Sequence, residues 1–244
     1  MRKFLIAATA ALMLVAGAAV AVAQTQKATL STSVSPKKAG TAKKPVNTSL
    51  FFKVVNQNPN ATLSKLQILI PKTLKLYGGR AWPKCTQATL DNRGKRFCPK
   101  ASRVGTGTAS AVLGVNNPPG KPRSPLTFKI TAFVGGRNKL NFFLESNEIS
   151  TLKITSPGTI TRNSSGSKLT IFVPKSAQSP DGVTYAGLQD IISTLGATYK
   201  GNQLIGAVGC RNKHHLLNAK LYFVNNGADP GGTAAASAAA NCRR

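Results

Sequence analysis

Hydrophobic and polar residues alternate with a period of two along much of the chain. In residues 126–134 every second side chain is apolar, while Lys129 falls on the opposite face. Successive side chains of a strand point to opposite faces of a sheet, so this pattern predicts a half-buried strand. Residues 139–145 alternate in the same way after Gly135-Gly136. The two runs therefore predict a β-hairpin with a glycine turn.

Similar alternation predicts further short strands, separated by turn sequences rich in Asn, Asp, Gly and Pro. These strands are expected at residues 28–34, 49–55, 64–70, 104–113, 168–173, 204–210 and 217–224. Many short strands at regular intervals are typical of an all-β fold. We predict an antiparallel β-sandwich of the immunoglobulin-like type, with a barrel as the alternative.

Two segments do not follow the period of two. Residues 188–195 have the spacing of one helix face at Leu188, Ile191, Ile192 and Leu195, which predicts one short helix. The Ile-Ile-Ser-Thr run also suits a strand. The Ala-rich residues 233–240 have a helix-forming composition. Gly231-Gly232 precede them and a cysteine follows, so we interpret them as an edge strand of small residues.

The first 23 residues have the pattern of a secretory signal peptide. A basic start at Arg2-Lys3 is followed by an apolar run and by the small residues Ala21-Val22-Ala23. An uncleaved membrane anchor is the alternative, because the apolar run could just span a bilayer. We predict cleavage, which leaves residues 24–244 as a secreted or envelope-associated β-sandwich domain, or as two packed sub-sandwiches, with no transmembrane segment.

Four cysteines, Cys85, Cys98, Cys210 and Cys242, fit an exported chain with two disulfides. Three pairings are open, and proximity along the chain favours Cys85–Cys98 with Cys210–Cys242. Zinc binding is the alternative. The cysteines lack C-x-x-C spacing, and the two histidines are adjacent to each other, so we predict neither a metal nor a cofactor.

Lys and Arg greatly outnumber Asp and Glu, 33 to 6, which gives a formal net charge of +27. Within residues 24–90 there is no carboxylate, and four lysines crowd together at Lys37, Lys38, Lys43 and Lys44. This charge either keeps a secreted protein dispersed or attracts it to an anionic surface. On the second interpretation, these four lysines bind an anionic envelope polymer or an acidic polysaccharide.

So few carboxylates leave little material for acid-base catalysis, and we predict that the chain is not an enzyme. Gly105-Thr106-Gly107 begins like a dinucleotide loop but continues as a strand. Cys210 could form a thiol-base pair with His214 or His215, yet Cys242 offers Cys210 a simpler partner. No Gly-x-Ser-x-Gly elbow is present to hold a serine nucleophile. An extracellular hydrolase is therefore the least favoured function.

Aromatic residues are too few and too scattered to predict stacking on bases, so no specific nucleic-acid binding is expected. Trp82, the single tryptophan, precedes Cys85. Its ring is expected to pack against a disulfide, since large aromatics are usually buried. The alternative function is a structural or adhesive module that recognises a protein or sugar through loops, with Trp82 exposed on one of them. The adjacent His214 and His215 are expected in a surface turn.

Several motifs together resemble a group of uncharacterised bacterial secreted proteins. They are Phe97-Cys98-Pro99-Lys100-Ala101-Ser102-Arg103 continuing to Ala109, Ile171-Phe172-Val173-Pro174-Lys175, the turn at Pro180-Asp181-Gly182, Gly209-Cys210, and Asn241-Cys242-Arg243. The resemblance covers most of the chain after the leader and implies an exported, β-rich domain with paired cysteines. Ala101 stands where the group has glycine. No activity or catalytic residue is implied.

Overall fold

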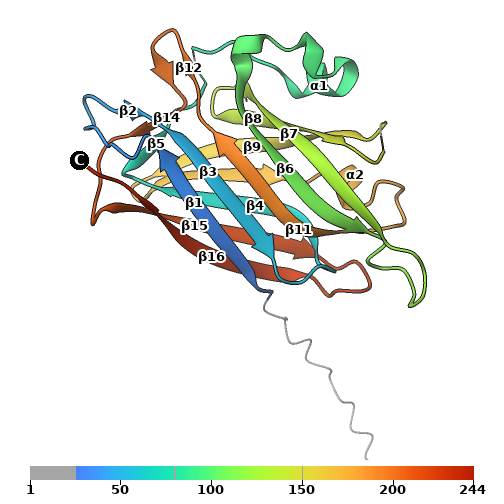
Figure 1. Cartoon of the computed structure of the whole chain (residues 1–244). Coiled ribbons are helices and arrows are strands. Elements are labelled where there is room, and N and C mark those ends of the chain that lie inside the picture. The colour runs from blue at the N-terminus through green and yellow to red at the C-terminus, as the bar shows by residue number, and fades with distance from the viewer. Residues whose placement is uncertain (1–25, 80, 150) are drawn as a thin grey trace, which may run out of the picture.

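The computed structural model describes residues 26–79, 81–149 and 151–244. The predicted signal peptide, residues 1–23, lies outside the described residues. Strands dominate the fold, and most of them belong to one large antiparallel sheet (Figure 1). The all-β prediction is therefore confirmed.

The large sheet has eleven strands that curve into a nearly closed barrel shape. In spatial order they are β1 (Ala28–Ser35), β3 (Ser49–Asn56), β11 (Ala186–Leu195), β6 (Arg103–Leu113), β7 (Ser124–Gly136), β8 (Lys139–Ser146), β9 (Lys153–Asn163), β10 (Gly166–Phe172), β4 (Thr62–Pro71), β15 (His214–Val224) and β16 (Gly232–Asn241). Each neighbouring pair is antiparallel. One continuous sheet replaces the two stacked sheets of an immunoglobulin-like sandwich, so that finer prediction is wrong.

The first and last strands of this sheet, β1 and β16, lie next to each other but form no ladder of hydrogen bonds, and we call this junction the seam. With an odd number of antiparallel strands, the two edge strands must run parallel to one another. Past the ends of the two strands, a parallel bridge joins Lys38 to Arg243. The strands therefore pack against each other along the seam, and hydrogen bonds join the two edges only at its ends.

At the other end of the seam, a buried carboxylate links the two edges. The two carboxylate oxygens of Asp229 accept hydrogen bonds from Gln26 Nε2 at 3.1 and 3.0 Å. Asp229 Oδ2 also accepts one from Asn58 Nδ2 at 2.6 Å, and Oδ1 accepts one from the Gly231 amide at 2.8 Å. The carboxylate is buried and all its donors are neutral, so hydrogen bonds rather than ion pairing stabilise it.

The two ends of the barrel-shaped sheet are closed differently. The end where β1 and β16 finish carries a small sheet of β2 (Val46–Asn47), β14 (Ile205–Ala207) and β5 (Leu74–Leu76), and we call it the plugged end (Figure 1). Buried side chains of these segments join the main core: Leu74, Leu76, Leu204, Ile205 and Ala207. The opposite end carries the short helix α2 (Lys175–Gln178), and we call it the α2 end.

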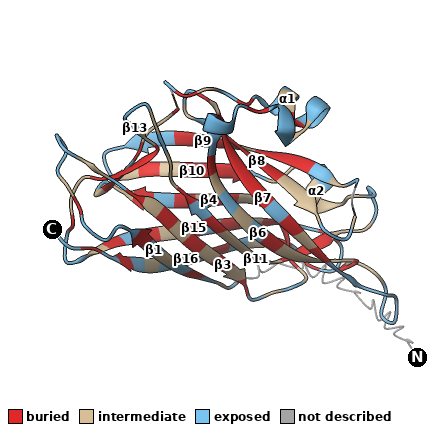
Figure 2. Ribbon diagram, turned by 45° about the horizontal axis from the view of Figure 1, so that its top comes forward, coloured by how far each residue is buried: buried red, intermediate tan, exposed pale blue. Residues whose placement is uncertain are grey.

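Buried residues alternate with more exposed ones along many of the strands (Figure 2), and the buried ones form the core. In β3, for example, Leu50, Phe52 and Val54 are buried, and the residues between them are only partly so. The period of two read from the sequence therefore corresponds to the inner and outer faces of this sheet.

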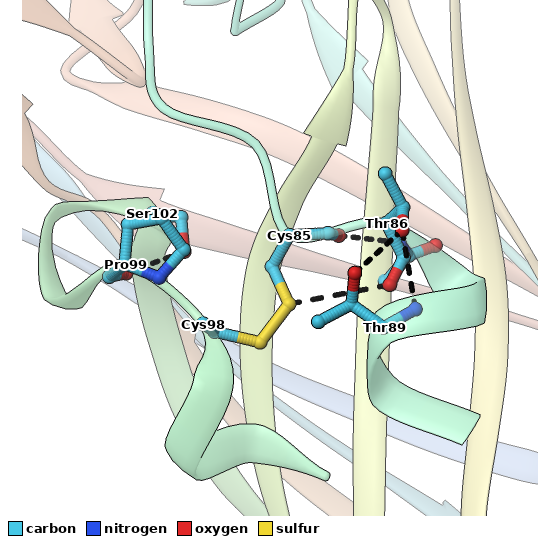
Figure 3. Close-up of a disulfide and its surroundings, with 7 residues drawn as sticks. Cys85, Thr86, Thr89, Cys98, Pro99 and Ser102 are labelled. Carbon is cyan, nitrogen blue, oxygen red and sulfur yellow. Dashed lines mark hydrogen bonds between the residues drawn. A yellow bond between two sulfur atoms is a disulfide. The ribbon is translucent and has the colours of Figure 1, made fainter. Parts of the chain in front are cut away.

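A small second cluster lies on the outer face of β7 and β8. The helix α1 (Gln87–Arg93) and the 3₁₀ turns Lys95–Phe97 and Lys100–Ser102 cover Phe133 and Phe143 there. The Cys85–Cys98 disulfide crosslinks this segment, and the Thr86 hydroxyl accepts a hydrogen bond from the Thr89 amide as the N-cap of α1 (Figure 3). A second disulfide joins Cys210 to Cys242. Both predicted pairings are therefore confirmed.

The helix predicted near residues 188–195 is wrong, because this segment is β11, a strand paired on both sides. Its register shifts between Leu188 and Asp190, which indicates a β-bulge. The extra residue places Leu188 and Ile191, three positions apart, on the same inner face of the sheet. A bulged strand can therefore imitate the spacing of a helix.

Candidate anion-binding surface

The loop between β1 and β2 presents the four clustered lysines to solvent. Lys37, Lys38, Lys43 and Lys44 are all exposed. Between the two pairs, the Ala39 amide donates to the Arg243 carbonyl at 2.8 Å and the Gly40 amide donates to the Ala207 carbonyl at 3.0 Å. The backbone at the centre of the loop is thus fixed to the plugged end, with a lysine pair on either side of it.

The fold brings two further basic segments to this loop. The Arg243 amide donates to the Lys37 carbonyl at 2.9 Å, and the Cys242 amide donates to the Lys213 carbonyl at 2.8 Å. The Cys210–Cys242 disulfide ties the same segments together. We define the basic end by the eight exposed cations of these segments: Lys37, Lys38, Lys43, Lys44, Arg211, Lys213, Arg243 and Arg244.

Sequence reasoning identified only four of these eight cations. The other four belong to segments about 170 to 200 positions later in the chain, and only the closing of the sheet brings them together. The predicted Cys210–Cys242 pairing was the one available signal, because it places the basic neighbours of both cysteines side by side.

The carboxylates lie mostly toward the other end of the molecule. Glu148, Asp181 and Asp229 are in loops at the α2 end, while Glu145 and Asp190 lie in the halves of β8 and β11 nearer to that end. Asp91 is the exception, in α1. Within the described part of the chain the one ion pair joins Lys95 to Glu145, so no cation of the basic end is paired with a carboxylate. The charge distribution is therefore strongly asymmetric along the sheet.

The two histidines lie in β15 rather than in the predicted surface turn. His215 faces the core with 1% of its surface exposed, and its Nδ1 is 2.8 Å from the Thr73 hydroxyl. The period of two in β15 explains this, because Leu217 and Ala219 are buried on the same face. Burial lowers the pKa of His215 to about 4, and the neighbouring His214 adds to the shift. The buried ring therefore favours the neutral state.

The pKa of His215 predicts a loss of stability in mild acid. The unfolded chain takes up a proton near pH 6.5, whereas the folded chain resists it until about pH 4. Stability is therefore full above pH 6.5 and falls as the pH is lowered toward 4, by a total of about 3 kcal/mol. Urea unfolding at several pH values measures this slope.

His215→Phe should flatten that slope, whereas His214→Gln should largely preserve it. The pKa values of Asp181 and Glu148 are lowered by hydrogen bonds, so their contributions are lost mainly below pH 4.5, near the bottom of this window. An equally steep slope in His215→Phe would contradict the assignment.

Trp82 is buried in the main core with 5% of its surface exposed, and its ring centroid lies 5.8 Å from that of Tyr199. This agrees with internal packing, although the neighbour is Tyr199 rather than a disulfide. The ring is not exposed on a loop, so the structure does not present it for recognition of a protein or sugar.

The candidate catalytic groups are engaged in structural roles. Cys210 is in a disulfide, so it carries no free thiol for His214. Gly105 and Gly107 lie in β6, where the backbone of β11 approaches closely: a Cβ on Gly107 would lie 2.2 Å from the Ile192 carbonyl oxygen. Among the described residues, no group of three or more His, Cys, Asp or Glu side chains could hold a metal ion.

Comparisons with protein-family models, with curated proteins and with solved structures return no match to this chain. The resemblance to bacterial secreted proteins therefore stays a prediction. In the described residues no helix is long and apolar enough to cross a membrane. The two disulfides indicate folding in an oxidising environment.

Proposed function

We propose that the chain is a secreted, non-enzymatic protein of the cell envelope or the medium that binds anionic polymers through its basic end. The observation that carries this proposal is the convergence of three cationic segments that have no carboxylate partner. Wall phosphates and acidic polysaccharides are polymers of the required charge.

Geometry supports binding to an extended polymer rather than to one small anion. The cations sit on exposed loops of three separate segments rather than around one buried position. Such cations act additively along a charged chain by displacing its counterions. Most of them are lysines, which suit diffuse attraction better than bidentate recognition of one group.

The test measures binding of residues 24–244 to long-chain polyphosphate and to alginate as a function of NaCl concentration. Affinity should fall steeply as salt rises, because counterion release drives the association. Replacing Lys37, Lys38, Lys43 and Lys44 by Gln should reduce the slope of log K against log salt by about 3, at ~0.7 per cation.

A matched variant separates the basic end from net charge alone. Replacing four exposed lysines at or near the α2 end, Lys27, Lys121, Lys153 and Lys175, by Gln changes the net charge equally. This variant should retain most of the wild-type affinity. Salt-independent binding, or equal losses in the two variants, would contradict the proposal.

A further inference from the structure

The interior of the sheet contains an apolar cavity of about 90 Å³ near the α2 end. Its walls come from the inner faces of strands around the sheet and include Phe52, Leu66, Phe128, Phe142 and Leu188. The plugged half of the interior is filled by the side chains of the small sheet. The α2 half lacks such a plug, so its core stays hollow.

Beside the cavity, the sheet is locally split. The ladder between β9 and β10 ends at Gly158 and Ile171, although β9 begins five residues earlier at Lys153. Ser156 of β9, Val173 just after β10 and Ala177 of α2 all line the cavity. Val173 and Ala177 are only partly buried, so we place the opening of the cavity between the start of β9 and α2.

The chemistry of the walls favours a hydrocarbon over water. Three serines, Ser110, Ser156 and Ser193, are the polar residues of the lining, and the Ser193 hydroxyl donates to the Thr106 carbonyl at 3.4 Å. A buried water needs two to four polar partners. Three serines do not supply these partners in every part of the cavity. The volume is smaller than the ~150 Å³ cavity that holds a benzene ring, so a narrower chain fits better.

Exposed cations flank the opening. Lys153 begins β9 and Lys175 begins α2, and both are exposed. Glu145 lies in register with Lys153, but it is paired with Lys95. An anionic head group at the opening would therefore meet two lysines.

From this cavity and its cationic opening we infer that the protein binds the alkyl chain of a small anionic amphiphile, with the chain inside the sheet and the head group near Lys153 and Lys175. The segment containing α2 forms the outer wall of the site. This site is separate from the basic end, and it does not depend on polymer binding.

Straight-chain alkanoates from acetate to octanoate are the probes, with binding measured by calorimetry and by the rise in thermal midpoint. Affinity should increase about fourfold for each added methylene, as burial of that group predicts. It should level off near four carbons, since the cavity has room for about three water-sized groups and the carboxylate carbon stays at the opening. The alcohol of equal length should bind more weakly, because it lacks the anionic head.

Two substitutions should block the site. Ala109→Leu adds three carbons to the cavity wall, and Ala177→Phe closes the opening from α2 without altering a strand. Both should abolish the dependence on chain length, while Ala88→Leu on the exposed face of α1 should preserve it. Because there are two blocking variants, the test still decides if one of them fails to fold.

The outcomes separate clearly. Chain-length dependence in the wild type, lost in either folded blocking variant, supports the site. Absence of chain-length dependence in the wild type, or its persistence in both folded blocking variants, overturns the proposal. Equal binding of alkanoate and alcohol would contradict the predicted contact between an anionic head group and Lys153 and Lys175.

Discussion

Replacing both Cys210 and Cys242 by alanine should lower the free energy of unfolding by about 4 kcal/mol. This disulfide closes a loop with a sequence separation of 32, and the entropy of that closed loop sets the size of the effect. Both cysteines are buried, so alanine leaves no new polar group inside the protein. Urea unfolding under non-reducing conditions measures the change.

Removal of the other disulfide provides the control. Cys85→Ala with Cys98→Ala should cost about 3 kcal/mol, because its separation of 13 is shorter. The two variants should differ more clearly in hydrogen exchange: loss of Cys210–Cys242 should expose the amides of β16, and loss of Cys85–Cys98 those around α1. Full protection of β16 without its crosslink would show that the disulfide does not hold the seam.

Asp229→Ala should destabilise the fold by about 3 kcal/mol. The substitution removes the acceptor of four hydrogen bonds from Gln26, Asn58 and Gly231. The buried Gly231 amide loses its acceptor, while Gln26 and the half-buried Asn58 each lose their bonds to the carboxylate and keep one other acceptor. An unpaired buried donor costs about 1 to 3 kcal/mol, and some of these groups can regain water. Thermal or urea unfolding at pH 7 gives the difference.

Asp190→Ala is the matched control for that substitution. It removes one negative charge from a partly buried position of β11, so the change in net charge is the same. Its expected cost is below about 1 kcal/mol, as for most positions without a buried network. Similar losses in the two variants would indicate a general effect of charge rather than a specific role of Asp229 at the seam.

The alternating pattern located most strands of the large sheet, because burial of one face imposes a period of two. It missed β9, whose central Pro157-Gly158 resembles a turn. In the structure the ladder to β10 ends at Gly158, next to the proline. A Cβ on Gly158 would come within 2.9 Å of the Phe142 ring, so glycine is required by packing that the local sequence does not reveal.

The global shape could not be predicted in the same way. Local alternation is the same for a strand in a sandwich and for one in a barrel-shaped sheet, since both have one buried face. The distinction depends on which distant strands become neighbours, such as β4 with both β10 and β15. For the same reason, the lysine loop could be predicted from the sequence, but the other cations of the basic end could not be placed beside it.

The seam has a consequence for the order in which the chain can reach its native state. The contact between Gln26 and Asp229 joins residues 203 positions apart, so nearly the whole polypeptide must be in place before the first strand meets the last. Contacts of such long range carry the greatest entropic cost of loop closure and slow the search for the final arrangement. During synthesis, the apolar interior would stay accessible from the side until the final ten-residue strand emerges. This late interval is therefore the time of greatest vulnerability to aggregation and proteolysis.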